Sequence, residues 1–192
     1  MRKIISIKDE GKKKRRNQFL VGGILILVMV MSTIGYSFTR DQQNNNGNTK
    51  IIFNGYEFTQ VSGFWNLNIG NAQFSFKYNP NETQKINSKI NPISNYSNKP
   101  LYIYSQNPEA EIEIYRNLFY QNKIVQRVQD ACPQGETCDS SLPVKTCDDN
   151  FVIIKESNIT QITQDKNCVF IEGKNNLTML SDSFLYKIIG VQ

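Results

Sequence analysis

The longest apolar stretch of the chain lies close to its N-terminus. Between Arg16 and Arg40 there are 23 residues without a charged side chain, and the central part, residues 19–38, consists mostly of apolar residues. A helix of 20 residues is about 30 Å long, which matches the hydrocarbon thickness of a bilayer. The pattern therefore predicts one membrane-spanning helix over residues 19–38, with the lipid bilayer as its partner.

The pattern changes twice after this stretch. Residues 39–50 are rich in Asn and Gln and contain no large apolar residue. Such a composition buries too little apolar surface to offset the entropy lost on ordering, so it predicts a flexible polar stalk. Residues 51–192 come next as a single domain, long enough to enclose a hydrophobic core.

Alternation with a period of two dominates the start of this domain. Asn54-Gly55 stands between two β-rich runs, and both residue types tolerate the positive φ of a hairpin turn. Apolar residues also alternate with polar ones over residues 65–69 and 74–78, on either side of a turn at 70–71. The pattern predicts two hairpins, the second with one buried face.

Helical signals appear later in the chain. Asn107, followed by proline and acidic residues, is typical of a helix start, and Ile112, Tyr115 and Phe119 are expected to face inward. Alternation of Glu with apolar residues over 109–114 leaves a strand open as the alternative. Residues 176–189 carry one apolar stripe at helical spacing, formed by Leu177, Leu180, Phe184, Leu185 and Ile188.

Further strands are expected in four places, over residues 101–105, 123–131, 151–155 and 169–172. Strands and helices together predict an α+β domain with a mostly antiparallel sheet and two or three helices.

The positive charge of the chain is confined to one end. Residues 1–18 hold eight Lys/Arg and two acidic residues, a net charge of +6, so the rest of the chain has a net charge of −1. The folded part therefore has no excess positive charge for a phosphate backbone, and nucleic acid is not an expected partner. Beside an apolar segment, the basic tail predicts a cytoplasmic N-terminus and an extracytoplasmic domain in the cell membrane.

A cleaved signal peptide is the competing interpretation of the N-terminal segment. Ser32, Thr33 and Gly35 supply small residues near its end. The apolar cores of signal peptides usually span 7–15 residues, and this one is longer, so an uncleaved signal-anchor is favoured.

Four cysteines lie in the predicted exterior domain, at Cys132, Cys138, Cys147 and Cys168. An even number of cysteines in an exterior domain predicts disulfide bonds, and three pairings are possible. The pairing Cys132–Cys138 with Cys147–Cys168 is favoured, because the first closes a small loop and the second links two β-rich runs. A zinc site is disfavoured since no C-x2-C knuckle is present.

Few residues point to catalysis. The chain contains no histidine, which removes Ser-His-Asp and Cys-His arrangements, and it lacks the glycine-rich phosphate-binding motifs. Two pairs of acids remain, Asp148 with Asp149 and Glu109 with Glu113. Adjacent acids more often form turns, and acids at a helix start more often favour its dipole. No catalytic, metal or cofactor residue is therefore predicted.

Two other surface signals are weak. Four Asn-x-Ser/Thr sequons occur, at Asn81, Asn95, Asn158 and Asn176, and about three would arise by chance in this composition. Four aromatic residues, Trp65, Phe74, Phe76 and Tyr78, could form a platform for a carbohydrate. They are spaced as on strands, which favours the buried face of a sheet instead.

Three stretches of the C-terminal half resemble uncharacterised small membrane-anchored proteins of archaea. They are LPVKTCDDNFVIIKESN (142–158), NCVFIEGK (167–174) and SDSFLYKIIGV (181–191). The resemblance covers about the last 60 residues. It implies an exterior, cysteine-containing α+β domain behind an N-terminal anchor, and it implies no activity.

These observations favour a membrane-tethered extracytoplasmic domain that binds a ligand or supports an envelope assembly without catalysis. Its partner would be an exterior protein or glycan. The alternative is a small membrane-anchored enzyme that uses carboxylate chemistry on an exterior substrate. A cleft lined by acidic and polar groups would favour the enzyme.

Overall fold

The computed structural model describes residues 22–26, 28–29 and 49–192. Residues 22–26 and 28–29 are helical, and the other residues of the predicted membrane segment lie outside the described ranges. The predicted basic tail, residues 1–18, and the predicted stalk up to residue 48 also lie outside them. No helix within the described ranges is long and apolar enough to cross a bilayer. Residues 49–192 belong to one compact unit.

The first sheet of this unit is an antiparallel meander. Its strands are β1 (Lys50–Phe53), β2 (Tyr56–Val61), β3 (Phe64–Ile69) and β4 (Ala72–Phe76), hydrogen-bonded in that order. Asn54 and Gly55 have φ values of 48° and 83° in the turn between β1 and β2, which confirms the first predicted hairpin. β3 and β4 form the second.

The second sheet has five strands, and most of its pairings are parallel. The strands are β5 (Pro100–Ser105), β6 (Arg127–Asp130), β9 (Phe151–Glu156), β10 (Gln161–Asp165) and β11 (Cys168–Gly173), in the order β10-β11-β9-β5-β6. Only β10 and β11 are antiparallel to each other. The α+β class is confirmed and the antiparallel prediction holds for the first sheet. The second departs from it because its central strands are apolar on both faces, as is typical of parallel sheets.

Within residues 49–192, two helices carry most of the helical structure. They are α2 (Pro108–Tyr115), continued by the π-helix η2 (Arg116–Tyr120), and α3 (Leu177–Ile188); a short 3-10 helix, η1, spans Ile93–Asn95. The Asn107 side chain accepts a hydrogen bond of 2.9 Å from the Ala110 N–H, which confirms the predicted start of α2.

The predicted inward face of α2 is wrong at two of its three residues, because only Phe119 packs against the core as expected. Ile112 and Tyr115 are 54% and 40% exposed, whereas Ala110, Ile114 and Leu118 are fully buried. The true buried face also includes polar residues of α2 and η2, which have hydrogen-bonding partners inside the domain. A prediction based on apolar residues alone therefore placed Ile112 and Tyr115 on the inner face.

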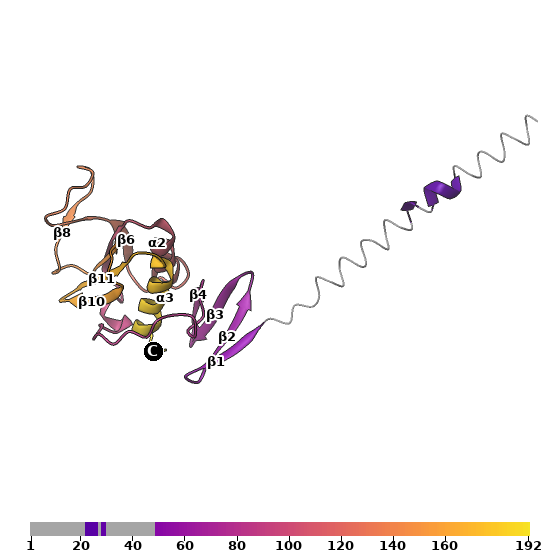
Figure 1. The fold of residues 1–192 in the computed structure, drawn as a ribbon, viewed down its shortest axis with the longest axis horizontal. Coiled ribbons are helices and arrows are strands. Elements are labelled where there is room, and N and C mark those ends of the chain that lie inside the picture. The colour runs from indigo at the N-terminus through magenta and orange to yellow at the C-terminus, as the bar shows by residue number, and fades with distance from the viewer. Residues whose placement is uncertain (1–21, 27, 30–48) are drawn as a thin grey trace, which may run out of the picture. The chain divides into compact units, whose positions relative to one another are not determined.

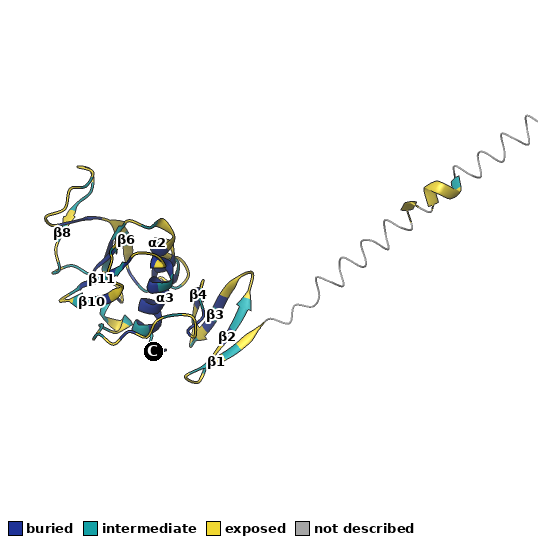
Figure 2. Cartoon of the chain, in the orientation of Figure 1, coloured by how far each residue is buried: buried dark blue, intermediate teal, exposed yellow. Residues whose placement is uncertain are grey.

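Helices α2 and α3 lie between the two sheets, as Figure 1 shows. The ring of Tyr186 on α3 lies 4.2 Å from that of Phe76 and 5.7 Å from that of Phe58 in the first sheet, and α3 also contacts β9 and β11 of the second. Because α3 is covered from both sides, most of its residues are buried (Figure 2), including Asp182, and only Met179 and Lys187 are partly exposed. The predicted stripe on α3 is buried, but it is not the only buried face.

Side-chain amides cover the outer edge of β4. Asn117 accepts from the Ser75 N–H at 2.8 Å and donates to the Ser75 carbonyl at 2.9 Å. Asn122 does the same at Gln73, with both distances 2.9 Å. The two asparagines therefore take the place of a fifth strand and satisfy an edge that would otherwise be open.

Candidate functional site

The second sheet has an outer face that the helices do not cover. Side chains alternate along its strands, so Leu101 and Ile103 of β5 point toward the helices, while Tyr102 and Tyr104 lie on the outer face. The outer positions of β9 and β11 are also aromatic, apolar or sulfur-containing, namely Phe151, Ile153, Cys168 and Phe170. A sheet with apolar residues on both faces requires a cover on each face.

The cover of the outer face is a segment held by disulfide bonds, residues 132–147, which we call the stapled segment. Cys132 is bonded to Cys138 within it, and Cys147 is bonded to Cys168 on β11. This is the pairing favoured from the sequence. The segment also contains a two-stranded parallel sheet, formed by β7 (Cys132–Pro133) and β8 (Val144–Lys145). The second bridge ties the end of the segment directly to the sheet.

A cavity of about 310 Å³ lies between the stapled segment and the outer face; we call it the stapled cavity. The sheet contributes Phe151, Ile153, Lys155, Cys168 and Phe170 to its lining. The stapled segment contributes Pro133, Gln134, Glu136, Lys145, Thr146 and Cys147. The lining therefore combines an apolar base with charged and polar groups at the rim.

Two lysines of this lining lie over tyrosine rings of the outer face. The Lys145 ammonium is 4.1 Å from the centre of the Tyr102 ring, and the Lys155 ammonium is 5.6 Å from that of Tyr104. Both distances are within the range of cation–π attraction. Lys155 also forms an ion pair with Glu136.

The surroundings of Tyr102 are electropositive. Arg127 donates a hydrogen bond of 3.1 Å to the Tyr102 hydroxyl. Hydrogen bonding from Arg127, and then from Lys145, lowers the pKa of the Tyr102 phenol below its ordinary value. A phenol that ionises more readily reports a positive local potential, which also favours an anionic ligand.

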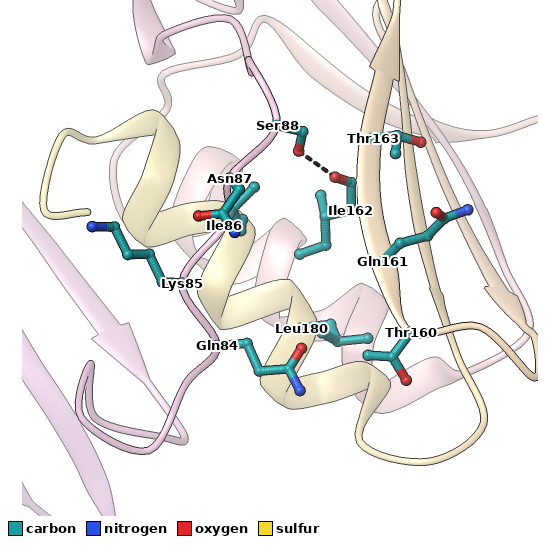
Figure 3. A pocket seen from close by; sticks show the side chains of 10 residues that line it. All are labelled: Gln84, Lys85, Ile86, Asn87, Ser88, Thr160, Gln161, Ile162, Thr163 and Leu180. Carbon is teal, nitrogen blue, oxygen red and sulfur yellow. Dashed lines mark hydrogen bonds between the residues drawn. The ribbon is translucent and has the colours of Figure 1, made fainter.

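A second cavity, of about 290 Å³, has a different chemistry (Figure 3). It lies between residues 84–88 and the edge strand β10, and Leu180 of α3 contributes to its lining. The Ser88 hydroxyl donates to the Ile162 carbonyl and so fixes the loop against β10. Apart from Lys85, the polar side chains in this lining are amides and hydroxyls, so the cavity offers little charge for recognition.

Among the described acids, the one whose pKa is shifted most strongly, Asp182, lies in neither cavity. Asp182 of α3 is fully buried, and its Oδ2 accepts a hydrogen bond of 2.9 Å from the Tyr78 N–H. Its Oδ1 has no hydrogen-bond donor within the described residues. Glu113 of α2, 3% exposed, lies within hydrogen-bonding reach of Asp182 and forms an ion pair with Arg116.

Burial, followed by the negative charge of Glu113, raises the pKa of the Asp182 carboxyl well above its ordinary value. When it is protonated, Asp182 can donate a hydrogen bond to Glu113, which relieves the repulsion between two adjacent carboxylates. Because the pair is enclosed between α2 and α3, a substrate has no access to it in this structure. It is therefore a structural contact between the helices rather than a reaction centre.

The acid pairs singled out in the sequence are not brought together as reaction centres. Asp148 and Asp149 lie near the surface, each 3.4 Å from a lysine. Glu109 is exposed and forms an ion pair of 2.8 Å with Lys77, apart from the buried Glu113. Within residues 22–26, 28–29 and 49–192, no group of three or more potential metal ligands is clustered.

The predicted aromatic set belongs to the core. Trp65, Phe74 and Phe76 are buried, and Tyr78 is partly buried, so the set does not form an exposed platform. Of the residues that line the stapled cavity, the sequence singled out Cys147 and Cys168, as a disulfide pair, and missed the others. The available signal was the alternation of tyrosine with apolar residues over 101–105, which indicates a strand with two covered faces.

Comparison with protein-family models, with curated proteins and with solved structures finds no match to this chain. The geometry of the stapled cavity is therefore the basis on which a function can be assigned.

Proposed function

We propose that this chain is a single-pass membrane protein whose C-terminal domain lies outside the cytoplasm and binds a ligand in the stapled cavity. The uncharged segment 19–38 would form the anchor, residues 1–18 the cytoplasmic tail and residues 39–50 the spacer between bilayer and domain. The charge difference across the segment supports the orientation. The two disulfide bonds support an oxidising, exterior location.

The observation that carries the binding proposal is the construction of the stapled cavity. Its base consists of strand residues, and its rim is bonded covalently to β11 through Cys147 and Cys168. Groups held on strands and by a crosslink lose little freedom when a ligand binds, which favours affinity. Apolar surface with a few charged groups is the usual composition of a ligand site.

The chemistry of the cavity supports binding rather than catalysis. The ionisable groups of its lining are Lys145, Lys155 and Glu136, and Glu136 is engaged by Lys155. A general acid–base pair would require a second acid or a base near a reacting atom. Asp182, whose carboxyl has a strongly raised pKa, is enclosed and cannot reach an exterior substrate in this structure.

Photocrosslinking in intact producing cells tests this proposal. A benzophenone amino acid in place of Thr146, which is exposed and lines the cavity, should capture the native ligand. The same amino acid in place of Asn68, an exposed residue of β3, is the matched control. An adduct at position 146 that is absent at position 68 supports binding in the cavity. No adduct at 146, or equal labelling at both positions, contradicts it.

A further inference from the structure

We infer that the stapled cavity recognises a ring-bearing monocarboxylate, a molecule with one flat apolar face and one carboxylate group. This inference rests on the proposed function and names the chemical class of its ligand. Two kinds of molecule have this chemistry: an acidic sugar, whose pyranose ring has an apolar face, and an aromatic acid. The titration described below distinguishes them.

The size of the cavity limits the ligand to about one ring. Its volume of about 310 Å³ is at the lower end of the range for small-molecule sites. The stapled segment closes one side and β9 and β11 the other, so an extended chain would have to leave the cavity rather than lie inside it.

The apolar base offers a surface for a ring. Phe170 is partly buried and lines the cavity beside the Cys147–Cys168 bridge. Together with Phe151 and Ile153, it gives the strand side of the lining an apolar patch. A ring that covers this patch removes it from water, which is favourable in proportion to the buried area.

The rim supplies the charge. The cavity lining has two lysines and one glutamate, and each lysine has an acidic neighbour: Glu136 pairs with Lys155, and Asp149, outside the lining, lies 3.4 Å from Lys145. The side chains of Lys145 and Lys155 are 22% and 25% exposed, so both lysines are held against the domain and still reach solvent, where an anion can approach them. When Glu136 turns away from Lys155, one lysine is left without an acidic partner, and a single ligand carboxylate neutralises it.

Glu136 has a defined role in this arrangement. Its carboxylate forms an ion pair with Lys155 and therefore occupies the position that a ligand carboxylate would take. The ligand must displace it, and Glu136, which is exposed, is free to turn into solvent. Glu136 thus competes with the ligand, and its removal should tighten binding while removal of Lys155 should weaken it.

Titration of the full-length protein in detergent micelles tests the inference. Glucuronate and benzoate serve as probes, and glucose and benzyl alcohol serve as their uncharged counterparts. We expect at least one of the two carboxylates to bind and its uncharged counterpart to bind at least about tenfold more weakly. The tighter of the two carboxylates identifies the source of the ring.

Four variants assign the binding to the cavity. Lys145→Gln and Lys155→Gln should each weaken binding of the carboxylate by about tenfold, and Glu136→Gln should tighten it by about threefold. Lys85→Gln removes a lysine from the cavity of Figure 3 and should leave binding unchanged. The opposite effects at positions 155 and 136 are not produced by a general loss of folding.

Several outcomes would overturn the inference. They are no binding of either carboxylate, equal binding of the uncharged counterparts, equal loss with Lys85→Gln, and no gain with Glu136→Gln. The crosslinking experiment at Thr146 detects a native ligand of any charge. A crosslink without carboxylate binding therefore rejects the ligand class and leaves the binding function standing, whereas the absence of a crosslink rejects the function itself.

Discussion

Replacing Asp182 with asparagine should remove a pH dependence of stability that the wild-type domain carries. Asp182 is fully buried, and its raised pKa keeps it protonated in the folded domain at pH values where an unfolded chain has lost the proton. Asparagine mimics the protonated form. Its oxygen can still accept from the Tyr78 N–H, and its NH₂ group can donate to Glu113.

The sign and size of the effect follow from proton binding. Between a pH of about 4, where aspartate in an unfolded chain ionises, and the raised pKa of Asp182, the Asp182 site holds up to one more proton in the folded domain than in the unfolded chain. The free energy of unfolding therefore falls as pH rises toward the raised pKa of Asp182, at up to about 1.4 kcal/mol per pH unit. Asp182→Asn has no ionisable group at this position, so the free energy of unfolding of the variant, relative to that of the wild type, should increase as the pH rises over this range.

Urea denaturation of residues 49–192 at a series of pH values between about 4 and 8 measures this difference. Taking the difference between variant and wild type cancels the titration of all other groups. Asp148→Asn is the matched control, because Asp148 is an exposed aspartate 3.4 Å from Lys166, and its difference curve should be nearly flat. A flat or falling difference for Asp182→Asn would refute the protonated pair.

Three other features carry predictions that denaturation and proteolysis check. Tyr96→Phe should leave the free energy of unfolding unchanged or raise it by up to about 1 kcal/mol, because the buried Tyr96 hydroxyl has no partner within the described residues. Tyr186→Phe should lower it by about 1–2 kcal/mol, because the Tyr186 hydroxyl donates to a carbonyl at 2.7 Å. Equal changes for the two variants in urea denaturation would contradict this. The double variant Cys147→Ser/Cys168→Ser should lower the free energy of unfolding by about 2–4 kcal/mol in the same assay. This is more than the loss expected for the Cys132–Cys138 bridge, which closes a shorter loop. Protease added to intact cells should digest the compact domain and spare residues 1–18, and a protected domain would reverse the proposed topology.

Local patterns predicted much of the fold because the forces behind them are local. The turn at Asn54-Gly55 and the start of α2 at Asn107 depend on backbone preferences and hydrogen bonds within a few residues. The apolar stripe of α3 was visible for the same reason. Partners distant in sequence left no such signal. Strand β10 was missed, and the parallel pairing of β9 with β11 joins two strands that are separated in sequence by β10.

The buried polar contacts could not be predicted from residue types. Glu113 and Asn117 occupy the inner face of α2 and η2 because Arg116, Asp182 and the edge of β4 satisfy them. Each of these partners comes from a neighbouring turn or from a distant part of the chain. A pattern of apolar positions alone therefore assigned the inner face to Ile112, which is exposed.

The disulfides and the stapled cavity have a common physical cause. A mostly parallel sheet with two apolar faces usually has helices on both, but here α2 and α3 lie on one face only. The other face is covered by sixteen residues with two-residue strands, too few to bury a core of their own. The Cys147–Cys168 bridge holds this short cover in place, and because the cover is short it leaves part of the face open. The same deficit of apolar packing thus requires the crosslink and creates the space in which a ligand can bind.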